Sequence, residues 1–342
     1  MILRPKSLLR HSGALSGGTA TAPASAVPSW LRRAASDAQT VAAQSVEDIA
    51  ITAGAALCAL DAAVRRQERW AGAWRQRLAL SAAAATAKQG VRVEDEAALR
   101  DAVLLTRPGD FLSVGPAGLL LLAWRRLAAR PGDELLTEKN LAAVLEEFGY
   151  APDDEVVSDL ADDLRQLAAG AGMVATLTGT FMAAERHGFA RAVGTWLADA
   201  LLAQRMGWPH AVPLLGAEAA LGASDRPRRS AASSVATSIG TNPERAKSLL
   251  AAQARAALRA IDLSAELERR ANRLLAVAPK LRAKGADAVV DQLLNDDALV
   301  ASRGDKKTGM SDRGLRRLFD RLVELGAVRE LSGRSTFRIY GL

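Results

Sequence analysis

The residues best placed to do chemistry are four arginines near the C-terminal end of the chain. Arg313, Arg316, Arg317 and Arg321 recur at a spacing that puts them on one face of a helix. A guanidinium group binds a phosphate, or the edge of a guanine, through two parallel hydrogen bonds. The spacing therefore predicts a helical face that contacts duplex DNA through its major groove.

The helix that carries these arginines is predicted to begin after Ser311, a good N-cap residue that we also count among the DNA contacts. Gly326 is expected to end it, because glycine readily adopts the positive φ of a helix C-terminus. The face opposite the arginines is apolar and would hold the helix against a small core. Its residues are Leu315, Leu318, Phe319, Leu322, Val323 and Leu325.

Two short strands, 328–331 and 335–340, are predicted around a Ser-Gly turn. Alternation along the second strand places Phe337 and Ile339 on one side and the basic residues on the other. Those basic residues, Arg334 and Arg338, are predicted to reach phosphates or an adjacent groove.

A helix followed by a basic hairpin indicates a winged helix-turn-helix, with upstream helices expected near 286–294 and 296–302. The connection 303–309 is long and basic where a tight turn is usual. Lys306 and Lys307 in that connection are predicted to touch phosphates. The alternative is that the second helix is short or displaced.

Charge is concentrated at the two ends of the chain. The net charge of +7 arises from +5 in residues 1–36, +5 in residues 303–342 and −3 in the remainder. A basic end attached to a near-neutral body favours an anionic partner for that end. Residues 1–44, rich in Ser, Ala, Gly and Pro, are predicted to be a disordered tail. A transit peptide also fits their composition.

The fold class predicted is mainly α, with a multi-helix bundle followed by the small winged module and its one β-hairpin. Ala, Leu and Arg dominate residues 45–221, where Gly and Pro divide the chain into roughly seven to nine helices. Tryptophans there are expected to anchor the core. The predicted divisions are a tail (1–44), a helical domain (45–221), a Ser/Arg linker (222–242), connecting helices (243–285) and the winged module (286–342).

Several short motifs carry a resemblance to a known family. They are WAGAWRQRL (70–78), EDEAALRD (94–101), GPAG (115–118), MGWP (206–209), VPLL (212–215) and the stretch 311–342. Through them the chain resembles the bacterial domain-of-unknown-function family 1403 over about residues 45–342. The terminal stretch is also similar to winged-helix ends of bacterial Fic-like and related proteins. The resemblance implies a helical protein and brings no catalytic residues.

Enzyme signatures are missing from the sequence, so we expect no enzymatic activity. It contains no phosphate-binding P-loop and no Gly-x-Ser-x-Gly elbow. His187 and His210 are interpreted as structural residues, with Glu185 as the helix-end partner of His187. Acidic clusters such as 153–155 are interpreted as helix starts, so no metal or other cofactor is expected.

The sequence thus predicts a DNA-binding protein whose helical body serves oligomerisation, as a homodimer, or contact with a protein partner. Regulation of transcription and maintenance of a replicon both fit. The alternative is an interaction scaffold whose winged helix binds protein instead of DNA. The single cysteine, Cys58, favours a reducing compartment, and we expect a bacterial cytoplasmic protein. No apolar stretch reaches the roughly 18 residues of a membrane-spanning helix, so no membrane association is expected. The DNA-binding hypothesis places the protein at the nucleoid.

Overall fold

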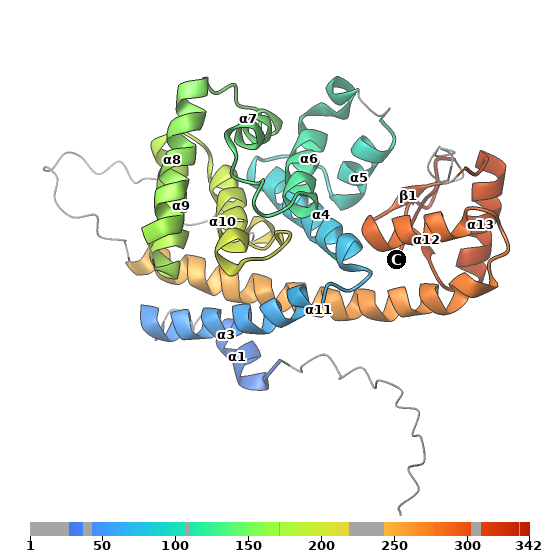
Figure 1. Cartoon of the computed structure of the whole chain (residues 1–342), viewed down its shortest axis with the longest axis horizontal. Coiled ribbons are helices and arrows are strands. Elements are labelled where there is room, and N and C mark those ends of the chain that lie inside the picture. The colour runs from blue at the N-terminus through green and yellow to red at the C-terminus, as the bar shows by residue number, and fades with distance from the viewer. Residues whose placement is uncertain are drawn as a thin grey trace, which may run out of the picture.

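The computed structural model describes residues 27–36, 43–106, 110–170, 172–218, 243–301, 309–334 and 336–342. It is mainly helical, as predicted (Figure 1). The helices are α1 (Ser29–Ser36), α3 (Val46–Arg65), α4 (Ala71–Gln89), α5 (Glu96–Leu104), α6 (Gly115–Ala129), α7 (Glu138–Glu147), α8 (Asp154–Gly170), α9 (Met173–Arg186), α10 (Arg191–Met206), α11 (Pro243–Val277), α12 (Ala286–Asn295) and α13 (Asp312–Glu324). Short 3-10 turns cover Phe111–Val114, Leu215–Ala217 and Ala278–Lys280.

Helix α11 is the longest element and runs along the length of the molecule, between α3 and the other helices of the body (Figure 1). Its 35 residues correspond to about 50 Å at 1.5 Å per residue. Pro243 occupies its first turn, where a missing N–H costs nothing. Helix α3 packs along it, and both α9 and α4 contact its other side. The helix predicted to be a connection is therefore a central part of the core.

Part of the segment predicted to be a disordered tail is folded. Helix α1 packs against α3 and α11, with Leu31 and Ala35 each 1% exposed. Arg32 donates two hydrogen bonds to the Asp262 carboxylate on α11, at 2.8 and 2.6 Å. The prediction is wrong for this helix because two apolar side chains, one turn apart, find a groove between two long helices. The rest of the predicted tail up to residue 26, and the predicted linker, lie outside the described residues.

Tryptophans anchor the helical body, as predicted. Trp124 and Trp196 are fully buried, and Trp208 is 3% exposed. Each indole N–H has an acceptor: that of Trp124 donates to the Thr86 hydroxyl at 3.1 Å, that of Trp196 to the Ala123 carbonyl at 2.9 Å, and that of Trp208 to an Asp61 carboxylate oxygen at 2.8 Å. Burial with a satisfied N–H lets these large rings stabilise the contacts between helices.

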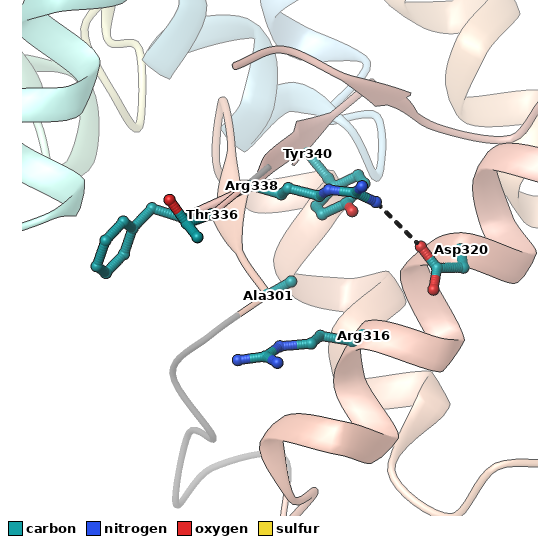
Figure 2. A pocket seen from close by; sticks show the side chains of 7 residues that line it. Ala301, Arg316, Asp320, Thr336, Arg338 and Tyr340 are labelled. Carbon is teal, nitrogen blue, oxygen red and sulfur yellow. Dashed lines mark ion pairs between the residues drawn. The ribbon is translucent and has the colours of Figure 1, made fainter. Parts of the chain in front are cut away.

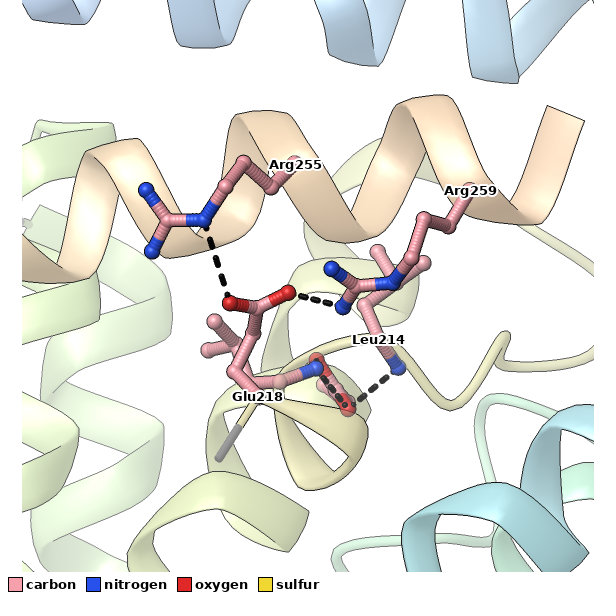
Figure 3. Close-up of polar contacts among 6 residues, drawn as sticks. Leu214, Glu218, Arg255 and Arg259 are labelled. Atoms are coloured by element: carbon pink, nitrogen blue, oxygen red, sulfur yellow. Dashed lines mark hydrogen bonds and ion pairs between the residues drawn. The ribbon is translucent and has the colours of Figure 1, made fainter. Parts of the chain in front are cut away.

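A buried carboxylate holds the turn that follows α10. Asp199 is 1% exposed and accepts hydrogen bonds from the backbone N–H of Leu214 at 2.7 Å and of Leu215 at 3.0 Å. Just beyond this turn, Glu218 pairs with Arg255 and Arg259 on α11 (Figure 3). Burial raises the pKa of Asp199 to about 7, although the backbone N–H donors oppose the shift.

This raised pKa predicts that stability falls as pH rises from about 4 to about 7. In that window folded Asp199 keeps a proton that the unfolded chain, with a pKa of 3.8, has released. The free energy of unfolding then drops by up to about 1.4 kcal/mol per pH unit from this group. We expect Asp199→Asn to remove that slope, measured by urea unfolding across the window. If the free energy of unfolding changed with pH in the same way in Asp199→Asn and in the unchanged protein, Asp199 would not be the source of the slope.

The C-terminal module comprises α12, α13 and a three-stranded sheet of β1 (Leu299–Val300), β2 (Arg329–Glu330) and β3 (Ile339–Gly341). The strand order is β1-β3-β2 and both pairings are antiparallel. The helix predicted at 296–302 is wrong, because residues 299–300 pair with β3 instead. The hairpin strands are also shorter than predicted, and β1 is an additional strand.

The module rests directly on the helical body, where α12 packs against α4. Gly72 on α4 allows this approach, since a Cβ there would lie 2.7 Å from the Cα of Asn295. The C-terminal residue, Leu342, is 2% exposed, and its carbonyl accepts a hydrogen bond from Arg270 on α11 at 3.1 Å.

Candidate nucleic-acid interface

Helix α13 begins and is oriented as the sequence predicts. The Ser311 hydroxyl accepts a hydrogen bond from the Gly314 N–H at 3.3 Å and so caps the helix. The apolar face is buried through Leu315, Leu318, Phe319 and Leu322, but Val323 is 39% exposed and does not belong to it. Phe319 stacks on Tyr340 of β3, with ring centroids 4.5 Å apart. This stack joins the helix to the sheet.

The exposed face of α13 is positively charged in its first half. Arg313, Arg316 and Arg317 are exposed, and none of them forms an ion pair within the described part of the chain. Arg321 differs, because it pairs with Glu324 at 2.7 Å. The helix lies at one end of the molecule, away from α3 and α8 (Figure 1). The described residues therefore leave these three guanidinium groups open to an approaching ligand.

The two arginines of the hairpin are held in different ways. Arg334 forms an ion pair with Asp101 on α5, which draws this side chain toward the helical body. Arg338 lies near α13, with its guanidinium nitrogens 3.6 Å from Asp320 and 3.8 Å from Glu330. The structure thus brings Arg338, and not Arg334, to the arginines of α13. Lys306 and Lys307 lie outside the described residues.

A cavity of about 300 Å³ separates α13 from the hairpin (Figure 2). Its walls carry two guanidinium groups, a carboxylate, two hydroxyls and two aromatic rings. They come from Arg316, Asp320, Thr336, Phe337, Arg338 and Tyr340. Figure 2 shows Arg338 extending toward Asp320, with Arg316 on the same side of α13. Burial raises the pKa of Tyr340 above its usual value, although a hydrogen bond with the Arg338 side chain opposes the shift.

The prediction that Phe337 lies on the same side of a strand as Ile339 is wrong. Phe337 is 59% exposed, whereas Ile339 is 1% exposed. Residues 336–338 precede β3 and are not part of it, so the alternation of a strand does not extend to them. The backbone of Phe337 has φ +54°, which turns the ring out beside the cavity.

A buried cluster centred on Asp297 anchors the module to the body. The Asp297 carboxylate is fully buried and pairs with Arg100 at 3.0 Å and with Arg125. Arg77 donates to the Asp297 carbonyl oxygen at 3.2 Å, and burial lowers the pKa of that guanidinium. Gly341 leaves room for this arrangement, since a Cβ there would lie 2.6 Å from the same carbonyl oxygen. Sequence reasoning missed the cluster, because Arg100 is 197 positions from Asp297.

His187 and His210 are the two histidines among the described residues. His187 Nε2 lies 3.0 Å from Asp163 on α8, and not beside Glu185, which pairs with Arg245. Burial first, and then the charge of Arg75, lower the pKa of His210. Among the described residues, no group of three or more His, Cys, Asp or Glu is arranged to hold a metal ion.

Comparison with known proteins identifies one family. The model of the family described as a protein of unknown function (DUF1403) matches residues 17–342, which extends the resemblance seen in the sequence toward the N-terminus. No curated protein and no solved structure matches the chain. Within the described residues, no helix is long and apolar enough to cross a membrane. Because the match covers nearly the whole length, the chain belongs to the DUF1403 family of proteins of unknown function.

Proposed function

We propose that this protein binds duplex DNA through α13 and the adjoining hairpin. The observation that carries the proposal is the set of three exposed arginines, Arg313, Arg316 and Arg317, which form no ion pair among the described residues. They lie on the first half of a helix whose other face is buried. The N-terminal half of a recognition helix is the part that contacts base edges in helix-turn-helix proteins. Guanidinium groups placed there can bind guanine edges or phosphates.

The arrangement of the sheet supports a winged-helix interpretation. The strand after α12 and the two strands of the hairpin form a sheet in the order β1-β3-β2, and α13 packs on this sheet. In this interpretation the turn between β2 and β3 is the wing, and Arg338 is its contact with a phosphate. Arg334 is assigned to holding the wing on α5 through Asp101. The C-terminal module differs from the predicted winged helix at residues 299–300, which form a strand where a second helix was expected.

A homodimer would place two such helices on one DNA site, and this would compensate for the few contacts that one module makes. We therefore propose that the helical body mediates self-association, with transcription regulation or replicon maintenance as the roles that fit.

We also propose that the protein is not an enzyme, because many of its charged groups are committed to pairs that hold helices together, such as Arg126 with Glu147.

The test is a titration of full-length protein against a labelled random duplex at several salt concentrations, read by fluorescence anisotropy. Three to four phosphate contacts predict a log–log slope of affinity against salt of about −3 to −4. Absence of binding at low salt would overturn the proposal and favour a protein partner for the same arginines, to be sought by capture on the full-length chain.

A further inference from the structure

The cavity beside α13 carries an aromatic ring in an unusual setting. Phe337 is 59% exposed, although most large apolar side chains of the C-terminal module are buried. Its backbone φ of +54° is disfavoured for a bulky side chain. Such a conformation persists only where the surrounding structure imposes it, and it is found most often at binding sites.

The chemistry of the cavity matches one nucleotide. Its volume of about 300 Å³ is at the lower end of ligand sites and suits a single base. The ring of Phe337 offers a flat face for stacking, and Arg316 and Arg338 supply positive charge to the same cavity. Arg338 shares one hydrogen bond with the Tyr340 hydroxyl, and its contacts with Asp320 and Glu330, at 3.6 and 3.8 Å, are longer than hydrogen bonds. A guanidinium carries five N–H donors, so others remain to bind an anion.

We propose that this cavity binds one unpaired base of the DNA that α13 holds. The base stacks on Phe337, while Arg316 and Arg338 bind its phosphate. The base must be unpaired because, inside a duplex, its faces are covered by neighbours and its pairing edge by its partner. The proposal rests on the DNA binding proposed above, and it names the class of DNA preferred: duplex with a bulged or extruded base.

The polar wall of the cavity predicts which base is preferred. The carboxylate of Asp320 is a hydrogen-bond acceptor, and it lies on α13 one turn from Arg316. Cytosine and adenine carry an amino group that can donate to it, whereas thymine does not. We therefore expect an unpaired cytosine or adenine to bind more tightly than an unpaired thymine.

The experiment compares the affinity of full-length protein for three labelled probes at one salt concentration. The probes are a perfect duplex, the same duplex with one bulged cytosine, and the corresponding single strand. We expect the bulged duplex to bind about tenfold more tightly than the perfect duplex. Phe337→Ala and Phe337→Leu should each reduce this ratio to about one, and Phe337→Trp should retain it. Leucine is the matched control, since it keeps apolar volume but has no aromatic face.

The outcomes distinguish the proposed base site from the proposed binding of duplex DNA through α13. Binding of the perfect duplex without any preference for the bulge, or equal weakening of all probes by Phe337→Ala, overturns the base site and leaves DNA binding intact. Failure to bind any probe overturns both. If Phe337→Ala weakens binding of the single strand as well as of the bulged duplex, the result supports the base site and shows that the site does not need flanking duplex. Thermal melting checks that each variant is folded, which we expect because Phe337 is exposed.

Discussion

Replacing both Arg316 and Arg317 with alanine is expected to lower the affinity for duplex DNA about 100-fold at moderate salt, since each charge-assisted hydrogen bond contributes about tenfold or more. Both side chains are exposed and lack an ion pair among the described residues, so the substitutions should leave the fold intact. The slope of log affinity against log salt should become shallower by about 2, one for each phosphate that is no longer neutralised. Fluorescence anisotropy across a salt series measures both quantities.

The matched control is Arg269→Ala/Arg273→Ala on α11. These two arginines are also exposed, and their replacement changes the net charge of the protein by the same amount. If binding arose only from the overall positive charge, the two double variants would weaken it equally. If α13 is the interface, the control should stay within about twofold of the unchanged protein. Equal weakening would therefore exclude a specific role for α13.

Replacing Asp297 with alanine is expected to lower the free energy of unfolding by about 3–5 kcal/mol. The carboxylate is fully buried and pairs with Arg100, which is 9% exposed, and with Arg125. Its removal leaves two guanidinium groups, largely shielded from water, without a counter-charge. It also removes the anchor between the C-terminal module and the helical body. Urea unfolding followed by circular dichroism measures the change.

Asp291→Ala is the control for this effect. Asp291 lies on the adjacent helix α12 and also pairs with an arginine, Arg69, at 3.1 Å. Both side chains of that pair are more than 60% exposed. Exposed pairs contribute about 0–1 kcal/mol, because water solvates the partner that is left. A similar destabilisation in the two variants would show that burial of Asp297 is not the cause.

The local elements were largely predictable because their signals lie close together in the sequence. Ser311 caps α13, and Pro243 starts α11, since both effects act within one helical turn. The described part of residues 45–218 contains eight α-helices, α3 to α10, within the range predicted. The apolar spacing of α13 also identified its buried face correctly at Leu318 and Phe319.

Predictions were wrong where a distant partner decides the local structure. Residues 299–300 were expected to be helical, but pairing with β3 makes them a strand. Leu31 gave no sign of burial in a segment of low complexity, and it is buried because α3 and α11 form a groove for it. Phe337 was assigned to the same side as Ile339 of a strand that begins only after Phe337.

The candidate interface shows the same division. The sequence by itself determined a mainly helical chain with a charged, capped, amphipathic helix near its end, because charge, capping and periodicity are properties of neighbouring residues. Only the tertiary structure decided that Arg334 forms an ion pair with Asp101 on α5, whereas the pairing of Arg321 with Glu324, three residues along the same helix, is local. It also decided that an outward ring lies beside two guanidinium groups. Cavities and ion pairs between elements depend on distances that are set by packing across the whole fold.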